Sequence, residues 1–303
     1  MQKSLYNWLS TEFKNGEMPK VGGIFHIASL FICLITASVF IILFWKLKNK
    51  HSVTLGILLT IWSIMVISEI LKQWYVLKQY KLGIINQNVY IGYFPFFLCD
   101  MPLYFIPLYL ACYKVKKLRL YILDFLGIFS LYGGAIVLSY PSEIFKANIF
   151  LTVHSIFFHS IMLVLGSYLV ITNIVKLSWK SVFYAFAVFV VLWASVGIIN
   201  EILWRTLKSG RFNEIPNLLK ISHRLPNPFI KTISKVLGRE YVPSSIIYWF
   251  YPLFTFVASN TFFAIFGFIG LGIRKAIKTA QTHYQNKLKH RSFLRRQNVL
   301  KTF

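Results

Sequence analysis

A cysteine next to an acid, and a histidine further along the chain, are the residues best suited to chemistry in this sequence. Cys99 and Asp100 follow a proline-containing stretch, and His159 lies inside a later apolar run. A cysteine becomes a nucleophile when a base or a cation stabilises its thiolate, and an imidazole can be that base. The pair therefore favours acyl transfer or thioester chemistry, with Cys99 as nucleophile and His159 as general base, if their helices are neighbours. Because a carboxylate disfavours an adjacent thiolate, we expect the Asp100 carboxylate to point elsewhere or to be neutral.

Other polar side chains are predicted to lie at the same depth in a membrane. Ionisable groups inside a bilayer are unfavourable, so each is a functional candidate. Alternate spans run in opposite directions, and four further polar residues then fall near one end of the bundle: His26, Glu69, Asn200 and Glu201. We interpret them, with Asp100, as supporting groups of a cavity around Cys99. Ordinary helical ion pairs, Glu69 with Lys72 and Glu201 with Arg205, are the alternative for the two acids.

Other catalytic signatures are absent from the sequence. It contains no G-x-S-x-G, no H-E-x-x-H, no P-loop and no G-x-G-x-x-G in a nucleotide-binding context. His154 and His159 are five residues apart, which places them about 140° apart on a helix and makes them poor partners for one metal ion. We expect no metal and no cofactor. A zinc hydrolase that uses His26, His154, His159 and an acid is the weaker alternative.

Membrane-spanning helices must position these residues. Of the 303 residues, 56% are hydrophobic and 14% are charged, whereas a soluble domain carries about a quarter charged residues. A spanning helix needs about 20 apolar residues. Seven runs are long enough, at approximately 23–45, 53–77, 89–112, 118–140, 147–173, 181–204 and 245–273. The fold class is therefore an all-α polytopic membrane helical bundle of about seven transmembrane helices, with kinks expected at the prolines of the third run.

The positions of Lys and Arg predict the orientation of the chain in the membrane and its partners. The net charge is +24, and cations follow the first, third and seventh runs, which all end on one side. The positive-inside rule then places the N-terminus outside and the C-terminus inside. We expect an outer segment 1–22, a membrane domain 23–273 that includes an amphipathic loop 205–244, and a basic cytoplasmic tail 274–303. The loop carries eight Lys and Arg on the opposite side, which the rule tolerates in long loops. Anionic lipid head groups at the tail, and no nucleic acid, are the expected partners; the oligomeric state stays open.

Short motifs along most of the chain carry a resemblance to a known family. They are Gly23–Ile27, Glu69–Gln73, Phe94–Asp100, Tyr140–Pro141, Phe158–Ser160 and Asn200–Glu201. By these motifs, over roughly residues 19 to 270, the chain resembles the YwaF family of bacterial integral membrane proteins. Ser160 stands where that family usually has glycine, and His154 and the basic tail lie outside the family pattern. The abundance of Lys, Ile and Phe is also typical of an AT-rich bacterial source, so we expect a bacterial plasma membrane.

The resemblance implies a reaction class. A eukaryotic branch that is distantly similar to the family comprises transmembrane acyltransferases, in which a cysteine takes an acyl chain from a phospholipid and passes it to a lysophospholipid. By this similarity Cys99 would carry the acyl thioester and His159 would act as general base. We therefore expect a lipid-directed acyltransferase that acts on a phospholipid or lysophospholipid. Two alternatives stay open: a transporter or lipid- or solute-binding protein without covalent chemistry, and a structural protein that anchors a partner through its tail.

Overall fold

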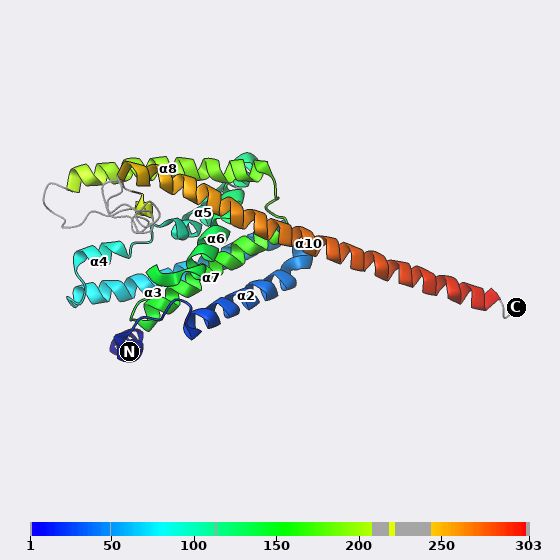
Figure 1. The fold of residues 1–303 in the computed structure, drawn as a ribbon, viewed down its shortest axis with the longest axis horizontal. Coiled ribbons are helices and arrows are strands. Elements are labelled where there is room, and N and C mark those ends of the chain that lie inside the picture. The colour runs from blue at the N-terminus through cyan, green and yellow to red at the C-terminus, as the bar shows by residue number, and fades with distance from the viewer. Residues whose placement is uncertain (1, 49, 113, 208–217, 222–243, 301–303) are drawn as a thin grey trace.

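The protein is a bundle of long helices. A computed structural model describes residues 2–48, 50–112, 114–207, 218–221 and 244–300. Within these ranges every regular element is helical, apart from one isolated bridge between Glu12 and Asn148. Six helices are long and apolar enough to cross a membrane, and one further apolar helix is shorter. The prediction of an all-α polytopic membrane bundle with about seven membrane helices is confirmed (Figure 1).

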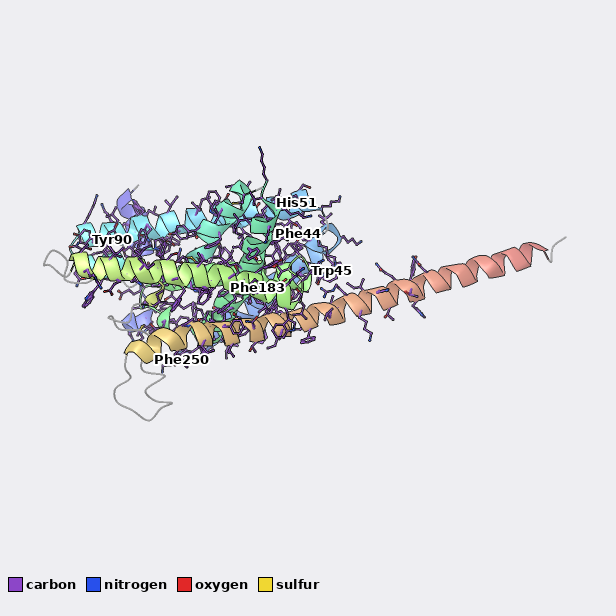
Figure 2. The ribbon with its side chains drawn as sticks, turned by 90° about the horizontal axis from the view of Figure 1, so that it is seen from above. Phe44, Trp45, His51, Tyr90, Phe183 and Phe250 are labelled. Atoms are coloured by element: carbon purple, nitrogen blue, oxygen red, sulfur yellow. The ribbon has the colours of Figure 1, made fainter. Side chains whose placement is uncertain are left out.

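The helices follow the apolar runs of the sequence closely. The six long ones are α2 (Ile24–Phe44), α3 (His51–Lys81), α6 (Lys116–Ser139), α7 (Ile149–Ile171), α8 (Trp179–Leu207) and α10 (Ser244–Leu300). In a bilayer every backbone polar group must be satisfied within its own segment, so a long apolar run becomes a helix. Figure 2 shows Tyr90 and Phe250 at one end of the bundle and Trp45, His51 and Phe183 toward the other end.

Helix α6 forms the buried centre of the bundle. It packs against α7, α8 and α10, and most of its residues from Ile122 onward are buried. Glycines let α6 and α7 approach closely, because a Cβ atom on Gly134 would lie 2.6 Å from the backbone nitrogen of Leu163. Small residues at such contacts are a common way of packing membrane helices. The tight α6–α7 pair forms a rigid base for the residues that α7 carries.

The third apolar run is broken into two helices. Run 89–112 was expected to be one kinked helix, but α4 (Gln87–Gly92) ends before Pro95, and the short helix η3 (Leu98–Asp100) leads into α5 (Met101–Ala111). Pro102 lies in the first turn of α5, where its missing N–H leaves no hydrogen bond unmade. Helix α5 is only about 16 Å long, against a hydrocarbon core of about 30 Å. Cys99 therefore sits where the third span is interrupted.

Both ends of the chain extend the bundle. Helix α1 (Gln2–Leu9) packs back onto it, since the Asn148 side-chain amide donates to the Leu9 carbonyl at 2.9 Å and to the Tyr75 hydroxyl at 3.0 Å. At the other end of the molecule, α10 continues as one helix far beyond the bundle (Figure 1). The basic segment that begins at Arg274 is thus a continuation of the last membrane helix.

Candidate functional site

Cys99 lies in η3, two residues before the first residue of α5. Its Sγ atom is 4.0 Å from Oδ1 of Asp100. The other carboxylate oxygen, Oδ2, accepts a hydrogen bond from the backbone N–H of Phe97 at 2.8 Å. An acid at this position caps the free N–H groups of the turn, as Asp commonly does at helix starts. Asp100 therefore shapes the turn that presents the thiol, with one oxygen turned to the backbone and the other toward sulfur.

Glu69 on α3 binds two polar side chains near this turn. Its Oε1 accepts hydrogen bonds from Lys72 Nζ at 2.7 Å and from Gln73 Nε2 at 2.8 Å. Gln73 also donates to the carbonyl of Tyr93 at 2.6 Å. The pair with Lys72 is the ordinary one-turn ion pair that the sequence suggested as an alternative. In addition, Gln73 attaches α3 to the extended segment that leads to Cys99.

Lys72 is the functional candidate that sequence reasoning missed. It was considered only as a partner for Glu69, yet its charge interacts electrostatically with Cys99 and with His159. The Lys72 side chain is only 13% exposed. A signal for it was present, because a lysine inside an apolar run is as unfavourable as an acid and is an equal candidate for function. A cation near a thiol stabilises the thiolate.

Two histidines on α7 face the same group of residues. Nδ1 of His159 lies 2.7 Å from the Ser155 carbonyl oxygen. A carbonyl can only accept, so Nδ1 donates here, which leaves Nε2 as the nitrogen that can act as a general base. Nε2 of His154 lies 3.8 Å from Oε2 of Glu69. Both imidazoles interact electrostatically with Lys72.

Asn200 on α8 reaches the cysteine segment through a second stretch of chain. Its side-chain amide donates to the Leu218 carbonyl and its side-chain oxygen accepts from the Leu218 N–H, both at 3.0 Å. The next residue, Leu219, donates its N–H to the carbonyl of Phe96 at 2.9 Å. Asn200 is therefore a positioning residue. Through Leu218 and Leu219 it holds Phe96, which lies three residues before Cys99. This link could not be read from the sequence.

Two of the predicted supporting residues make other contacts. His26 at the start of α2 accepts from the Gly22 N–H at 3.0 Å, and its Nε2 lies 2.7 Å from the Leu138 carbonyl oxygen. Both of its ring nitrogens thus serve to join α2 to the end of α6. Glu201 accepts from Nε of Arg205 at 2.8 Å, in the helical pair that was the alternative for it.

The structure thus groups Glu69, Cys99, Asp100 and His159 around the charge of Lys72, and it joins Asn200 to them indirectly. Within the described ranges, no group of three or more His, Cys, Asp and Glu side chains is arranged to hold a metal ion. The chemistry available at this site is that of a thiol, an imidazole and a cation. Such a set can form and break a covalent bond to an acyl group.

A family model matches residues 21–224 and includes all the candidate residues above. The chain belongs to the TMEM164 family. No curated protein and no solved structure matches it. The matched range of this TMEM164-family protein contains the interrupted third span and the α6–α7 pair and ends before α10. With its six long apolar helices, this member of the family is a multi-pass membrane protein. Its resemblance to the YwaF family and its bacterial source stay predictions.

Proposed function

We propose that this TMEM164-family protein is a lipid-directed acyltransferase with Cys99 as nucleophile and His159 as general base. The observation that carries the proposal is the position of the Cys99 thiol, at the break in the third span and at the start of α5. The charge of Lys72 acts on both this thiol and His159. The distant similarity of the chain's motifs to eukaryotic transmembrane cysteine acyltransferases supplies the reaction class, and the resemblance to the YwaF family and a bacterial plasma membrane remain part of the same proposal.

The first half of the reaction loads the cysteine. The Cys99 thiolate attacks the ester carbonyl carbon of a phospholipid, so a carbon–sulfur bond forms and the carbon–oxygen bond to the glycerol breaks. His159 Nε2 takes the thiol proton and returns it to the departing alkoxide. The products are an acyl thioester on Cys99 and a lysophospholipid. The Lys72 ammonium stabilises the negative charge that develops.

The second half transfers the acyl chain. The hydroxyl of a different lysophospholipid gives its proton to His159 Nε2 and attacks the thioester carbonyl. A carbon–oxygen bond forms, the carbon–sulfur bond breaks, and the proton returns from His159 to the sulfur. Atoms and charges balance without a cofactor. Asp100 and Asn200 act as positioning residues, since they hold the backbone of Phe97 and, through Leu218 and Leu219, of Phe96, just before the thiol.

One feature favours a second function, in which the cavity binds a solute or a lipid without covalent chemistry. Oε2 of Glu69 and Nε2 of His154 are buried without a hydrogen-bond partner in the described part of the chain. Such atoms could bind a polar group that enters between α3 and α7. Under this reading the acid is essential and the thiol is dispensable. The Cys99→Ala and Glu69→Gln variants therefore separate the two functions.

The test uses the purified full chain in lipid nanodiscs with a phosphatidylcholine whose acyl chains are deuterated. We expect a deuterated acyl group on Cys99, found by peptide mass spectrometry and released by hydroxylamine, and transfer of that chain to added lysophosphatidylcholine. Cys99→Ser abolishes both, whereas Cys112→Ser, at the other end of α5, retains both. His159→Ala slows thioester formation by about 100-fold or more. Undiminished acyl transfer by a folded Cys99→Ser variant would refute the proposal.

A further inference from the structure

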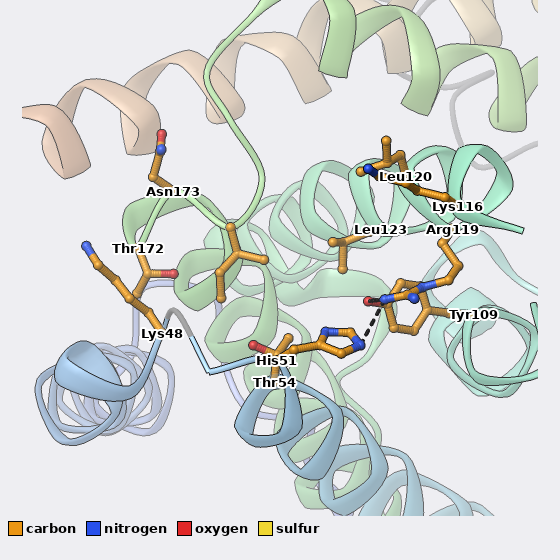
Figure 3. A pocket seen from close by; sticks show the side chains of 11 residues that line it. Lys48, His51, Thr54, Tyr109, Lys116, Arg119, Leu120, Leu123, Thr172 and Asn173 are labelled. Carbon is orange, nitrogen blue, oxygen red and sulfur yellow. Dashed lines mark hydrogen bonds between the residues drawn. The ribbon is translucent and has the colours of Figure 1, made fainter. Parts of the chain in front are cut away.

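A cavity lies at the end of the bundle opposite to Cys99. It measures about 560 Å³, which is within the range of small-ligand sites. Its walls come from the loop after α2 and the start of α3, and from the ends of α5 and α7 with the start of α6 (Figure 3). The first residue of α3, His51, is separated from Glu69 by about 27 Å along that helix. The cavity is thus a different site from the one around the cysteine.

The lining of the cavity is strongly basic. Lys48, Lys116 and Arg119 contribute three cations, and none of the eleven lining residues that the structure describes is acidic. Thr54 and Thr172 also line the cavity, and the Thr172 hydroxyl donates to the Tyr168 carbonyl one turn back along the chain. Three cations around one hollow repel one another, so an anion bound there would relieve that repulsion. The cations come from two separate loops that were predicted to lie on one side of the membrane.

Arg119 is held in place by its neighbours. Its Nη2 lies 3.1 Å from the Tyr109 hydroxyl and 3.0 Å from Nε2 of His51. The guanidinium also sits over the Tyr109 ring, 5.1 Å from its centre. Because arginine only donates, His51 Nε2 accepts here. A guanidinium fixed in this way has lost its side-chain freedom before any ligand arrives, which favours tight binding of a planar or tetrahedral oxyanion.

The surroundings of Lys48 favour the binding of an anion. Its Nζ is 4.0 Å from the centre of the Trp45 ring. Partial burial, together with the nearby charge of Arg274, lowers the pKa of Lys48. Arg274 itself donates to the carbonyl of Ile171 at 2.7 Å, directly before Thr172 of the cavity wall. A fourth cation thus adds to the positive potential of this corner of the bundle.

We propose that this cavity binds a phosphate group, carried either by a membrane lipid head group or by a small soluble phosphate. Lysine ammonium groups and a fixed guanidinium are typical donors to phosphate oxygens. Clusters of cations between membrane helices at the bilayer surface are typical sites for anionic head groups. The site does not depend on the chemistry proposed for Cys99, because the two share no residue.

The test compares two double variants that remove the same charge from the same face. The inner pair, Lys48→Gln with Lys116→Gln, removes two cations of the cavity wall. The outer pair, Lys46→Gln with Lys117→Gln, removes two exposed lysines that are sequence neighbours of the wall but do not line it. The midpoint of thermal unfolding of the full chain in detergent is followed at constant ionic strength. It is titrated with dioctanoyl phosphatidic acid, with dioctanoylglycerol, or with inorganic phosphate.

We expect a phosphate-bearing ligand to raise the unfolding midpoint of the unmodified chain, and dioctanoylglycerol to leave it unchanged. The inner pair should weaken the apparent affinity about tenfold or more, and the outer pair less than about twofold. A response to phosphatidic acid that inorganic phosphate does not compete away assigns a lipid head group. Full competition by inorganic phosphate assigns a soluble phosphate. Equal losses in both pairs, or no response of the unmodified chain to either phosphate ligand, would overturn the proposal.

Discussion

Oε2 of Glu69 and Nε2 of His154 face each other across α3 and α7 at 3.8 Å, and both atoms are buried without a hydrogen-bond partner among the described residues. The other oxygen of Glu69 neutralises Lys72 at 2.7 Å. Glu69 therefore has two duties inside the bundle. It compensates a cation, and it presents an acceptor to whatever polar group enters beside His154.

The buried pair of Glu69 and Lys72 should be important for stability. Glu69→Ala leaves the Lys72 charge uncompensated, so we expect a loss of about 3 kcal/mol or more. The matched change is Glu201→Ala, because its partner Arg205 has a side chain that is 75% exposed. That change should cost less than about 1 kcal/mol. Thermal unfolding of both variants in the same detergent measures the difference, and equal shifts would contradict the assignment of Glu69 to a buried pair.

Lys72 should control the reactivity of the cysteine. A nearby opposite charge favours a thiolate, by about tenfold for each unit of pKa. We expect Lys72→Gln to slow alkylation of Cys99 by iodoacetamide by about tenfold, and Lys72→Arg to keep most of the rate. Alkylation of Cys112 in the same samples, quantified by peptide mass spectrometry, is the internal control and should not change. If Cys99 reacts at the same rate in Lys72→Gln, the lysine has no influence on the thiol.

Asn200 should affect the reaction without touching the substrate. Asn200→Ala removes both hydrogen bonds to Leu218 and so loosens the attachment of Leu219 to Phe96. Each lost bond is worth about 1 kcal/mol, and the cysteine turn should become less well held. We expect the rate of acyl transfer and the rate of Cys99 alkylation both to fall. Asn260→Ala, which removes a bond to Phe256 within one helix, should leave both rates unchanged.

Two glycines should respond to alanine in opposite directions. At Gly134 an added Cβ would lie 2.8 Å from the His159 carbonyl oxygen, so Gly134→Ala should force α6 and α7 apart and destabilise the protein by about 1–3 kcal/mol. At Gly56 on α3 nothing lies within 4 Å of the added atom. Gly56→Ala should therefore be neutral or stabilise the helix by up to about 1 kcal/mol. Thermal unfolding of both variants checks the direction of each change in stability. An undiminished stability of Gly134→Ala would show that the α6–α7 contact accommodates an added methyl group.

The sequence alone determined the membrane class and the positions of the long helices. A membrane helix satisfies its hydrogen bonds within its own segment, so apolar length is sufficient information. Six of the seven runs became helices, five of them near the predicted bounds, while the last continues from the predicted end at residue 273 to Leu300. The prolines also marked the third run as irregular. They did not reveal that the chain separates into α4 and α5 with Cys99 at the break, because that geometry depends on Gln73 and Leu219 holding the segment from two other helices.

Contacts between distant segments were decided only by the tertiary structure. Membrane depth placed His26 and Glu69 at similar levels, but depth does not say which way a side chain faces around its helix. Packing brought the Glu69 side chain beside His154 and turned His26 toward the Leu138 carbonyl. In the same way, the sequence predicted that two basic loops share one side of the membrane. The convergence of Lys48 and Arg119 on one cavity depends on how α3, α5, α6 and α7 pack, which local sequence patterns do not encode.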